Sequence, residues 1–565
     1  MSWKIKQKLR ALLATETNLC SKGHGRGGDI SICLVYPNSY RTGMGNLGFQ
    51  TVYRLLAESA GIGCERAFLP DRDDLDEYRR SGRAMLSLES QRPLADFDVI
   101  AFSTSFEPDY LNIPTILILA GIPLYATERN QSYPLVIAGG AAFFINPEPV
   151  ADLIDVICTG EGEDIIPGFT AALLSPRRDE TRHALLTDLA AIPGIYVPSL
   201  YQPIFSQGML TGFDVEETAP YPVIRATACL EQHRPSSSQI LAEDAEFGDM
   251  FLIEVSRGCP RGCRFCSSGF IYGAFRQQPY EHLKAIVDEG LVHRGKFGLV
   301  GAAVSDYEEI GRLCRYIIGK GAMVSVSSLR IDRIDTEMLD ALLASGHRTI
   351  SLAPEGGSQR LRDLIRKNLS EAQILDASGM LVSRDILNLK LYVIIGLPTE
   401  TESDLEELIR LVEAIRELVI ERARANKRLG EITLSVNPFI PKPFTPFQWC
   451  GMESLTSLER KVKLLENRLR PLSNVRLKVE SLRGSYLQAL LSRGDRRLSP
   501  LLVAMAEGAS LKKAAKLCGI DTDRYVHRDI AEGEFLPWSV IGSADMLMLR
   551  REYERAFAEK GQQTQ

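Results

Sequence analysis

Three cysteines within eight residues constrain this chain more than any other feature. Cys259, Cys263 and Cys266 stand at a three-then-two spacing, directly after the apolar run of residues 250–255. Three thiolates cannot complete a four-ligand zinc site. They can bind three irons of a [4Fe–4S] cluster, and the fourth iron is then open to a ligand that is not protein. The motif therefore predicts a metal-cluster loop that follows a strand.

The alternatives to a cluster are a group of reduced surface cysteines or half of a zinc ribbon. A ribbon needs a second Cys-x-x-Cys pair, and none of the other cysteines supplies one. Most of those cysteines stand singly in apolar surroundings, as Cys33 and Cys314 do, which is typical of reduced thiols rather than of a disulfide framework. An oxygen-sensitive cluster also demands a reducing compartment, so we expect a cytoplasmic protein.

The composition indicates a soluble enzyme. At 565 residues the chain has room for several domains, and 45% hydrophobic with 24% charged residues is ordinary for globular proteins. No apolar run approaches the roughly 20 residues of a membrane span. The basic N-terminus lacks the apolar core of a signal peptide. A net charge of −6 gives no indication of nucleic-acid binding through a generally basic surface.

Residues 1–200 are predicted to form a Rossmann-like domain. Short apolar runs alternate there with helical patterns, which indicates a parallel sheet covered on both faces. The expected strands are residues 31–36, 98–103, 134–138 and 155–158. The loops after parallel strands form a ligand crevice, here from residues 37–43, 103–107, 139–142 and 160–163.

The rest of the chain is predicted to contain a linker, a partial barrel and a helical domain. Residues 201–248 are rich in proline, serine, threonine and glutamate, which favours an exposed linker. Residues 249–450 alternate strands and helices in six βα units, fewer than the eight of a closed barrel. The expected strands are residues 251–255, 298–300, 323–326, 349–352, 389–395 and 433–436. Residues 451–565 show helical spacing, so the predicted fold class is α/β with a mainly helical C-terminal region.

From residue 249 to 449 the chain resembles the radical S-adenosylmethionine (SAM) superfamily. The cysteine motif and the six-unit barrel carry this resemblance. It implies that SAM chelates the open iron of a [4Fe–4S] cluster. It also implies that an external electron donor, such as a flavodoxin or ferredoxin, drives cleavage of SAM to methionine and a 5′-deoxyadenosyl radical. That radical would abstract a hydrogen atom from a small-molecule substrate. Phe265, before the last cysteine, would lie near the adenine.

Three residues after later strands are candidates for contacts with SAM. Ser305 follows the second barrel strand, where family members place groups that meet the SAM amino group, but it could equally cap the next helix. Arg330 could bind the SAM carboxylate through its planar guanidinium, or form a surface salt bridge instead. Glu355, beside two glycines, could accept hydrogen bonds from the ribose or the amino group of SAM.

Further segments complete the expected site. Gly396 permits close approach of the backbone, and Pro398 fixes the turn after the fifth strand. The proline-rich loop of residues 437–449 can exclude water from a radical. The basic residues between 360 and 367 are expected mainly on the solvated face of a helix.

More specifically, the chain resembles an uncharacterised branch of the cobalamin-binding radical SAM proteins, in which a Rossmann domain precedes the radical core. The segments that carry this resemblance are residues 43–48, 87–90, 106–110, 138–140, 146–149, 160–163, 441–449 and 536–538. It implies cobalamin in the crevice, with Gly139 and Gly140 receiving the nucleotide tail, although an ordinary tight turn also explains these glycines. Residues 38–45 lack the histidine that often binds cobalt. Two alternatives stay open: cobalamin bound without that histidine, or a scaffold that has lost the cofactor.

The leading functional hypothesis is a cobalamin-dependent radical SAM methyltransferase that acts on an unactivated carbon. Without cobalamin, the same core could catalyse a cyclisation, a rearrangement or a methylthiolation. An iron–sulfur electron carrier is a hypothesis from another class, but a carrier needs no SAM-binding residues such as Glu355 and Arg330. The acidic balance does not favour a tRNA substrate. Neither the substrate nor the oligomeric state can be inferred from the sequence.

Overall fold

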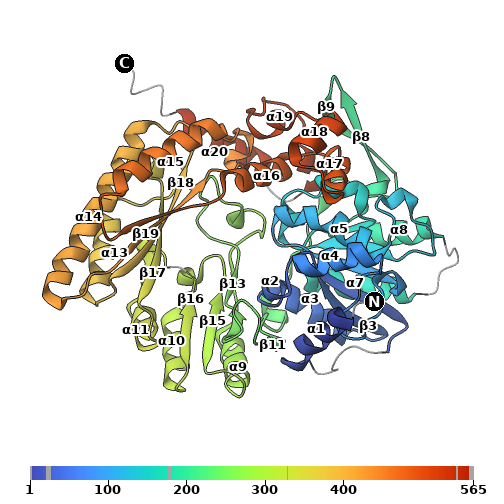
Figure 1. Ribbon diagram of the computed structural model, residues 1–565, viewed down its shortest axis with the longest axis horizontal. Coiled ribbons are helices and arrows are strands. Elements are labelled where there is room, and N and C mark those ends of the chain that lie inside the picture. Colours follow the sequence, from blue (N-terminus) through green and yellow to red (C-terminus); the bar gives the residue numbers. More distant parts are fainter. Residues whose placement is uncertain (1–2, 21–26, 176–180, 328, 543–544, 559–565) are drawn as a thin grey trace. The chain divides into compact units, whose positions relative to one another are not determined.

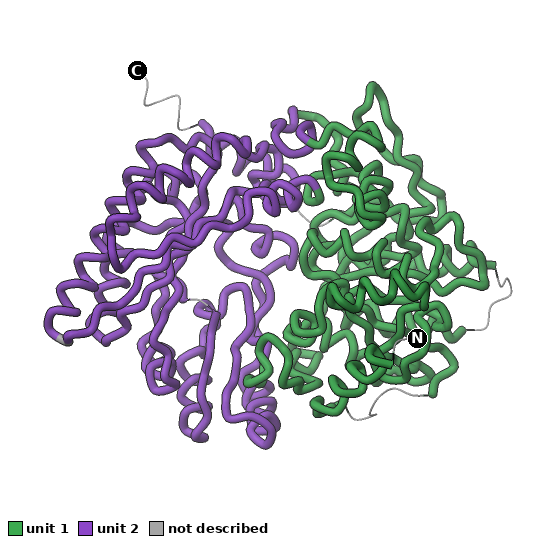
Figure 2. Tube along the Cα trace, viewed as in Figure 1, with its two compact units in different colours: residues 1–252, 491–522, 532–543 green, residues 253–490, 523–531, 544–565 purple. Residues whose placement is uncertain are grey.

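The computed structural model describes residues 3–20, 27–175, 181–327, 329–542 and 545–558 (Figure 1). The chain divides into two compact units, coloured separately in Figure 2. Unit 1 comprises residues 1–252, 491–522 and 532–543, and unit 2 comprises residues 253–490, 523–531 and 544–565. The predicted domains follow the order of the chain, whereas each unit recruits separate segments from beyond residue 490.

Unit 1 contains a sheet whose described strands have the order β3-β2-β4-β5-β6-β7. Strands β2 to β6 pair in parallel, and β7 is antiparallel at the edge. The bounds are β2 (Ile30–Tyr36), β3 (Ile62–Phe68), β4 (Val99–Ser103), β5 (Leu135–Gly139), β6 (Val156–Cys158) and β7 (Ile195–Tyr196). The predicted parallel sheet is confirmed. Its order reverses between β2 and β4, and ligand crevices of open α/β sheets lie at such switch points.

Helices and short strands complete unit 1. The helices are α1 (Trp3–Ala14), α2 (Tyr40–Met44), α3 (Leu47–Glu58), α4 (Arg72–Ser81), α5 (Asn112–Ala120), α6 (Ala141–Ile145), α7 (Gly162–Leu174), α8 (Arg182–Ala190), α17 (Leu498–Ala506) and α18 (Leu511–Cys518). A short helix, α19 (Thr522–Val526), continues into unit 2. Over the described ranges, no helix combines the length and the apolar character that a membrane span needs.

Strand β3 escaped prediction because charged residues stand at its centre. The Arg66 side chain is fully buried and donates hydrogen bonds to Glu16 Oε2 at 2.6 Å and to Glu89 Oε1 at 2.7 Å. Two carboxylates thus compensate a guanidinium that would otherwise be a buried, unpaired charge. The strand keeps its place at the edge of the sheet, paired with β2, despite its charged sequence.

The segment of residues 201–248, predicted to be an exposed linker, is an ordered part of unit 1. It forms the antiparallel hairpin of β8 (Tyr201–Ser206) and β9 (Met209–Val215). Strand β11 (Ile240–Ala242) pairs with β1 (Glu16–Asn18), and β10 (Val223–Ile224) pairs with β21 (Ile541–Gly542). Its serine-rich part is buried because polar groups bond internally, as the Gln239 N–H does to Gln50 Oε1 at 2.7 Å.

Unit 2 contains the partial barrel, in two sheets. Their described orders are β12-β15-β16 and β17-β18-β19-β20. The bounds are β12 (Phe251–Glu254), β15 (Lys296–Val300), β16 (Met323–Val326), β17 (Thr349–Glu355), β18 (Asn388–Ile395), β19 (Ile432–Pro438) and β20 (Val475–Val479). All six predicted strands are present. The Leu329 N–H donates to Ser351 O at 3.1 Å, so the chain after β16 connects the first sheet to the second.

Helices follow the strands of unit 2, as expected for βα units. They are α9 (Tyr280–Gly290), α10 (Ile310–Gly319), α11 (Thr336–Ala344), α12 (Gln359–Leu364), α13 (Glu371–Ser383), α14 (Glu402–Asn426), α15 (Leu455–Leu469), α16 (Leu482–Arg493) and α20 (Met546–Ala558). The seventh strand, β20, lies in a region predicted to be mainly helical. Its side chains alternate between half-buried and exposed, which fits an edge strand of the sheet.

Strand β18 shows why the barrel has two different faces. Leu389 and Leu391 alternate with Lys390 and Tyr392, and only the leucines are fully buried. Helices α13 to α15 lie on the outer side of this sheet in Figure 1. Burial of such leucines contributes about 1.5–3 kcal/mol each. The strand thus presents a polar inner face, with Lys390 Nζ 2.6 Å from the Tyr392 hydroxyl.

Candidate active site

The three cysteines lie on one loop of unit 2 that is closed at its base. Strand β13 (Ser256–Arg257) pairs antiparallel with β14 (Arg276–Gln277), so the intervening loop leaves the barrel just after β12. Gly258 and Gly262 have φ angles of +77° and +69°, which favour glycine. The loop therefore turns sharply on both sides of Cys259.

The three thiols are free and half-buried. Burial raises the pKa of Cys263 to about 11, although the nearby Lys367 charge opposes this effect. Burial also raises the pKa of Cys259. Cluster binding would displace the thiol protons, because the metal ligand is the thiolate.

In the described part of the chain, no group of three or more His, Cys, Asp or Glu side chains converges like the ligands of one metal ion. A [4Fe–4S] cluster does not require such convergence, since each thiolate binds a different iron. The donor set of Cys259, Cys263 and Cys266 thus fits a cluster with one open iron.

An arginine–aspartate network adjoins the cysteine loop and brings two predicted residues together. Arg261 lies between Cys259 and Cys263 in the sequence and pairs with Asp306 at 2.5 Å and with Asp332 at 3.3 Å. Arg330 forms a two-pronged pair with Asp332, with distances of 2.8 and 3.0 Å from Nη2. The Arg330 N–H also donates to Ser305 Oγ at 3.4 Å.

The network determines what Arg330 can offer a ligand. Burial would raise the pKa of Asp332, but Arg330 and Arg261 hold that pKa below its ordinary value. Asp332 is therefore a carboxylate that compensates the Arg330 guanidinium. If Arg330 binds the SAM carboxylate, its guanidinium must either contact Asp332 and SAM together or give up Asp332 for SAM. This contact stays a prediction. The contact predicted between Ser305 and the SAM amino group stays a prediction as well.

Several buried polar atoms in and beside this network lack hydrogen-bond partners, among them Arg261 Nε. Ser256 Oγ and Asp306 Oδ2 make none in the described structure, although Asp306 Oδ2 lies 3.4 Å from Arg330 Nε. Buried polar groups are nearly always hydrogen-bonded, so unsatisfied buried atoms are a sign of a missing ligand or water. They fit a polar cosubstrate bound beside the cysteine loop.

Glu355 ends β17 in a backbone conformation that is unusual for glutamate. Its φ angle is +66°, and the register between β17 and β18 shifts between Leu352 and Glu355. Its carboxylate is 17% exposed and lies 3.3 Å from Lys367 Nζ. Lys367 is only 12% exposed, so it does not lie on a solvated helix face. Through Lys367, Glu355 is linked to the surroundings of Cys263.

Phe265 packs against a hydrophobic cluster that fixes the last part of the cysteine loop. The cluster includes Leu361, Ile365, Leu397, Phe439 and Phe447. Leu397 lies between Gly396 and Pro398, so the structure brings the predicted turn close to the cysteine loop. Gly396 has φ +72°, and a Cβ there would lie 2.7 Å from Leu458 Cδ2. Packing therefore explains this glycine without any ligand.

Sequence reasoning missed the importance of two charged residues. Arg264, between the second and third cysteines, is 9% exposed and donates to Leu364 O at 2.8 Å. Arg362 is fully buried and donates to the carbonyl oxygens of Gly356 and Gly357 at 3.2 Å. Arg362 thus holds the loop that follows Glu355. The position of Arg264 inside the cysteine motif was the sequence signal that could have indicated its importance.

In unit 1, the two glycines predicted to receive a nucleotide tail are enclosed by their own neighbours. A Cβ on Gly140, whose φ is +109°, would lie 2.4 Å from Thr104 O, and one on Gly139 would lie 3.2 Å from Cys158 Cβ. Internal packing is a sufficient reason for both glycines. Their predicted contact with cobalamin stays a prediction.

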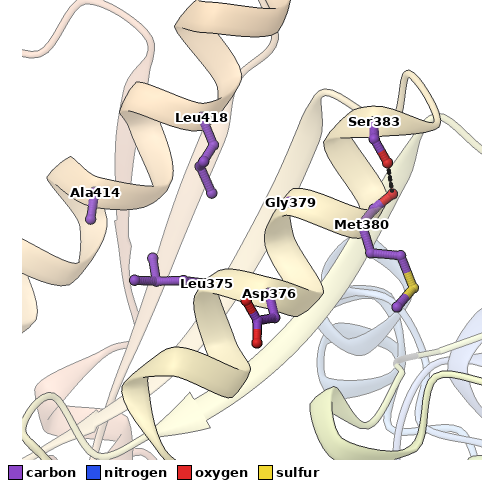
Figure 3. A pocket seen from close by; sticks show the side chains of 7 residues that line it. All are labelled: Leu375, Asp376, Gly379, Met380, Ser383, Ala414 and Leu418. Atoms are coloured by element: carbon purple, nitrogen blue, oxygen red, sulfur yellow. Dashed lines mark hydrogen bonds between the residues drawn. The ribbon is translucent and has the colours of Figure 1, made fainter.

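A groove on the outside of the barrel is unrelated to these groups. It measures about 520 Å³ and lies between α13 and α14 (Figure 3). Its lining residues are Leu375, Asp376, Gly379, Met380, Ser383, Ala414 and Leu418. It contains no cysteine and none of the predicted site residues, so the cysteine loop remains the candidate active site.

The partial barrel and its cysteine loop define an α/β protein with a candidate iron–sulfur site. Comparison with known protein families shows the family to which the chain belongs. The family described as "Radical SAM superfamily" matches residues 253–412, and the one described as "Radical SAM proteins, N-terminal" matches residues 48–198. Together they cover more than half of the chain. The chain therefore belongs to the radical SAM superfamily, and membership implies an enzyme that uses SAM and a [4Fe–4S] cluster.

Curated relatives give little further detail. An uncharacterised protein of Methanocaldococcus jannaschii is 28% identical over 500 residues, which cover 88% of this chain and 96% of that protein. The ribosomal protein uS12 methylthiotransferase RimO of Thermotoga sp. is 27% identical over 188 residues, or 31% of this chain and 43% of that enzyme. The second match thus spans less than half of a characterised relative.

Two solved structures are similar to parts of this chain. The radical SAM methyltransferase TsrM of Kitasatospora setae is 15% identical, with a TM-score of 0.47 and 74% of each chain covered. The cobalamin-dependent radical enzyme OxsB, with aqua-cobalamin and SAM bound, is 15% identical, with a TM-score of 0.46, 87% of this chain and 70% of that chain covered. Likeness at this level assigns neither a reaction nor a cofactor to this chain.

Proposed function

We propose that this enzyme cleaves SAM reductively at a [4Fe–4S] cluster held by Cys259, Cys263 and Cys266. The observation that carries the proposal is the convergence of the cysteine loop with Glu355. The cysteine loop follows β12, and Glu355 is the last residue of β17. Lys367 lies 3.3 Å from the Glu355 carboxylate, and its charge also acts on Cys263. Barrel enzymes collect their catalytic groups at this end of the strands.

When bound, the cluster would pass one electron to SAM, and an external donor of the flavodoxin or ferredoxin class would supply that electron. The electron would break the C5′–S bond of SAM and yield methionine and a 5′-deoxyadenosyl radical. Glu355 accepts hydrogen bonds from SAM, while Ser256 and Asp306 offer further polar atoms beside it. The radical takes a hydrogen atom from a substrate C–H bond, giving 5′-deoxyadenosine and a substrate radical. The inner face of the barrel, with Lys390 and Tyr392, is where the substrate would be oriented.

The test is anaerobic reconstitution followed by iron analysis and detection of 5′-deoxyadenosine. The wild-type chain should bind about four irons and form 5′-deoxyadenosine slowly after reduction, even without substrate. Replacing Cys259, Cys263 and Cys266 by alanine should abolish both. The control Cys229→Ala removes an exposed thiol that has no role in the proposal. Unchanged iron content in the triple variant would refute the assignment.

A second candidate function adds cobalamin and makes the enzyme a methyltransferase. The observation that favours it is the switch point between β2 and β4 in unit 1. Asn46 donates there to Ser105 Oγ at 2.9 Å, and Phe106 is 56% exposed. Burial raises the pKa of Asp109 to about 6, and its Oδ2 atom makes no hydrogen bond. An unsatisfied carboxyl at a switch point favours a polar ligand.

Bound cobalamin would supply a methyl group to a substrate radical, whereas its absence would move the reaction to cyclisation, rearrangement or methylthiolation. Ser105→Trp should lower cobalamin retention after reconstitution, while Ser206→Trp, on the exposed hairpin, should not. No histidine stands in residues 37–46 after β2. Electron paramagnetic resonance of the cobalt(II) form should therefore show no nitrogen splitting from a protein imidazole. If the wild type retains no cobalamin at all, the methyl-transfer proposal fails.

A further inference from the structure

A carboxylate on helix α20 reaches the cysteine loop from far along the chain. Glu552 Oε2 lies 3.4 Å from Arg264 Nη2 and 3.3 Å from Arg366 Nη1. Arg555 Nη1 donates to Glu552 Oε1 at 2.7 Å. The Glu552 side chain is 9% exposed. One buried carboxylate thus compensates three guanidinium groups.

Two of these arginines belong to the immediate surroundings of the cysteines. Arg264 stands between Cys263 and Phe265, and its N–H donates to Ile365 O at 3.0 Å. Arg366 Nη1 would lie 3.7 Å from a Cβ placed on Gly262. The carboxylate of Glu552 therefore contacts the charges that flank the cysteine loop, although it touches no cysteine itself.

Helix α20 is also fixed to the proline-rich loop by aromatic contacts. Trp449 and Tyr553 lie 5.5 Å apart, and Phe447 and Phe557 lie 5.9 Å apart, between ring centroids. The Phe447 N–H donates to Arg264 O at 3.0 Å. These contacts hold Glu552 in place, so its position relative to Arg264 follows from the packing of the helix.

Glu552 is ionised in this setting. Burial would raise the pKa of Glu552, but the hydrogen bond from Arg555 and the charges of Arg366 and Arg264 hold it below the ordinary value. Net charge and hydrogen bonding around an iron–sulfur cluster are among the terms that set its reduction potential. An added electron is stabilised by nearby positive charge and opposed by nearby negative charge.

We propose that Glu552 is a positioning residue for the cysteine loop, which holds Arg264 in place and tunes the reduction potential of the cluster. The inference rests on the proposed cluster site. Arg264 and Arg366 favour the reduced cluster, and Glu552 offsets part of their charge. The C-terminal helix thus takes part in setting how readily the enzyme accepts the electron needed for SAM cleavage.

The test compares Glu552→Gln with Arg264→Gln by a redox titration of the reconstituted protein, followed by electron paramagnetic resonance. Glu552→Gln should shift the midpoint potential to more positive values, because Arg264 and Arg366, the two arginines beside the cysteine loop, lose a compensating carboxylate. Arg264→Gln should shift it to more negative values. Opposite shifts cannot result from simple loosening of the loop, which would move both variants in the same direction. Glu554→Gln, on the exposed side of α20 and paired with Arg550, is the matched control and should keep the wild-type potential.

Iron content provides the second readout. If Glu552→Gln loses iron, Glu552→Asp should restore it, since the charge returns, and that result supports the positioning role. A Glu552→Gln variant with wild-type iron and wild-type potential overturns the inference, as do shifts of the same sign in the two variants. A wild-type chain that binds no cluster would instead overturn the proposed function, so the two failures are distinguishable.

Discussion

Glu355 has the most demanding backbone conformation of the candidate SAM-binding residues. Left-handed φ angles cost non-glycine residues about 1–3 kcal/mol and persist where the surrounding structure enforces them. Glycines occupy the next two positions, yet a glutamate stands at φ +66°. A carboxylate at this point, the last residue of β17, is therefore kept although the backbone conformation would suit glycine better.

The first prediction compares two substitutions at this position. Both Glu355→Gln and Glu355→Gly should weaken SAM binding roughly ten- to hundredfold, because charge-assisted hydrogen bonds contribute about 1.5–3 kcal/mol. Glu355→Gly should nevertheless be at least as stable as Glu355→Gln, since glycine relieves the strained φ. Anaerobic calorimetry measures the affinity, and thermal unfolding measures the stability. Glu371→Gln, at an exposed helix start, is the control, and normal SAM binding by Glu355→Gln would show that the pocket lies elsewhere.

The candidate site could be predicted only where neighbouring residues in the sequence define it. The cysteine spacing, Glu355 beside its glycines and the turn at Gly396 are local signals. The pairing of Arg264 with Glu552 joins residues 288 positions apart, so no local pattern indicates it. Arg362 was missed for a related reason, because the carbonyl groups that it binds are created by the fold.

At the scale of elements, apolar patterns predicted the strands that are buried between helices. Strand β18 was predicted almost to its bounds because leucines and isoleucines recur along it. Strand β3 was not predicted, since burial of Glu65 and Arg66 depends on distant partners. The hairpin of β8 and β9 is not predicted, because the polar composition of this segment favours an exposed linker. The spacing of apolar residues thus predicts which apolar segments are buried, but it does not predict the burial of polar residues.

The second prediction concerns the turn after β18. Gly396→Ala should destabilise the protein by about 1–3 kcal/mol, because the new Cβ combines a left-handed φ with a contact of 2.7 Å to Leu458. Gly379→Ala is the matched control. Gly379 lies on α13, and a Cβ placed there would have no atom within 4 Å. That control should stabilise the protein by about 0.5–1 kcal/mol, through the helix preference for alanine. In urea unfolding, the midpoint concentration should therefore fall for Gly396→Ala and rise for Gly379→Ala.

The third prediction concerns the start of α14. Asp404 accepts hydrogen bonds from Ser358 Oγ at 2.5 Å and from the Thr401 N–H at 2.7 Å, and it pairs with Arg360. Burial would raise the pKa of Asp404, but these partners hold it below the ordinary value. A depressed folded pKa contributes stability above the unfolded pKa, near 3.9, and that stability is lost as the pH falls through the folded value.

Asp404→Asn should therefore lower the unfolding free energy at neutral pH by about 1–3 kcal/mol and flatten its decline in acid. Urea unfolding between pH 7 and the lowest pH at which the wild type stays folded measures both effects. A variant whose stability declines in acid as steeply as that of the wild type would show that Asp404 does not contribute to the acid sensitivity.

At the scale of the whole molecule, the chain returns to its first unit after completing most of its second. Arg496 lies 3.2 Å from Glu148 Oε1, and its Nη2 donates to the Tyr196 hydroxyl at 2.6 Å. Glu148 is fully buried beside the N-terminal sheet. The stability of unit 1 therefore depends on a residue from the last quarter of the chain, and cutting at residue 252 would remove it.

The fourth prediction follows from that dependence. In the full chain, Glu148→Gln should destabilise the protein by about 3–5 kcal/mol, because it breaks a buried ion pair. In a fragment of residues 1–252, the same substitution should be stabilising, since it removes a buried carboxylate that has lost its guanidinium. Urea unfolding of the four proteins, or their resistance to proteolysis, should show this reversal of sign. Destabilisation in both contexts would mean that another group compensates Glu148.

The distance between Glu148 and Arg496 along the chain also has a consequence in time. The two residues are 348 positions apart. A ribosome that adds about 5–20 residues per second needs roughly 17–70 s to travel from one to the other. During that interval the nascent N-terminal sheet carries a carboxylate without its partner, and the cysteine loop has not yet met Glu552. Chaperones can therefore reach the N-terminal unit during this interval, before its last segments have been made.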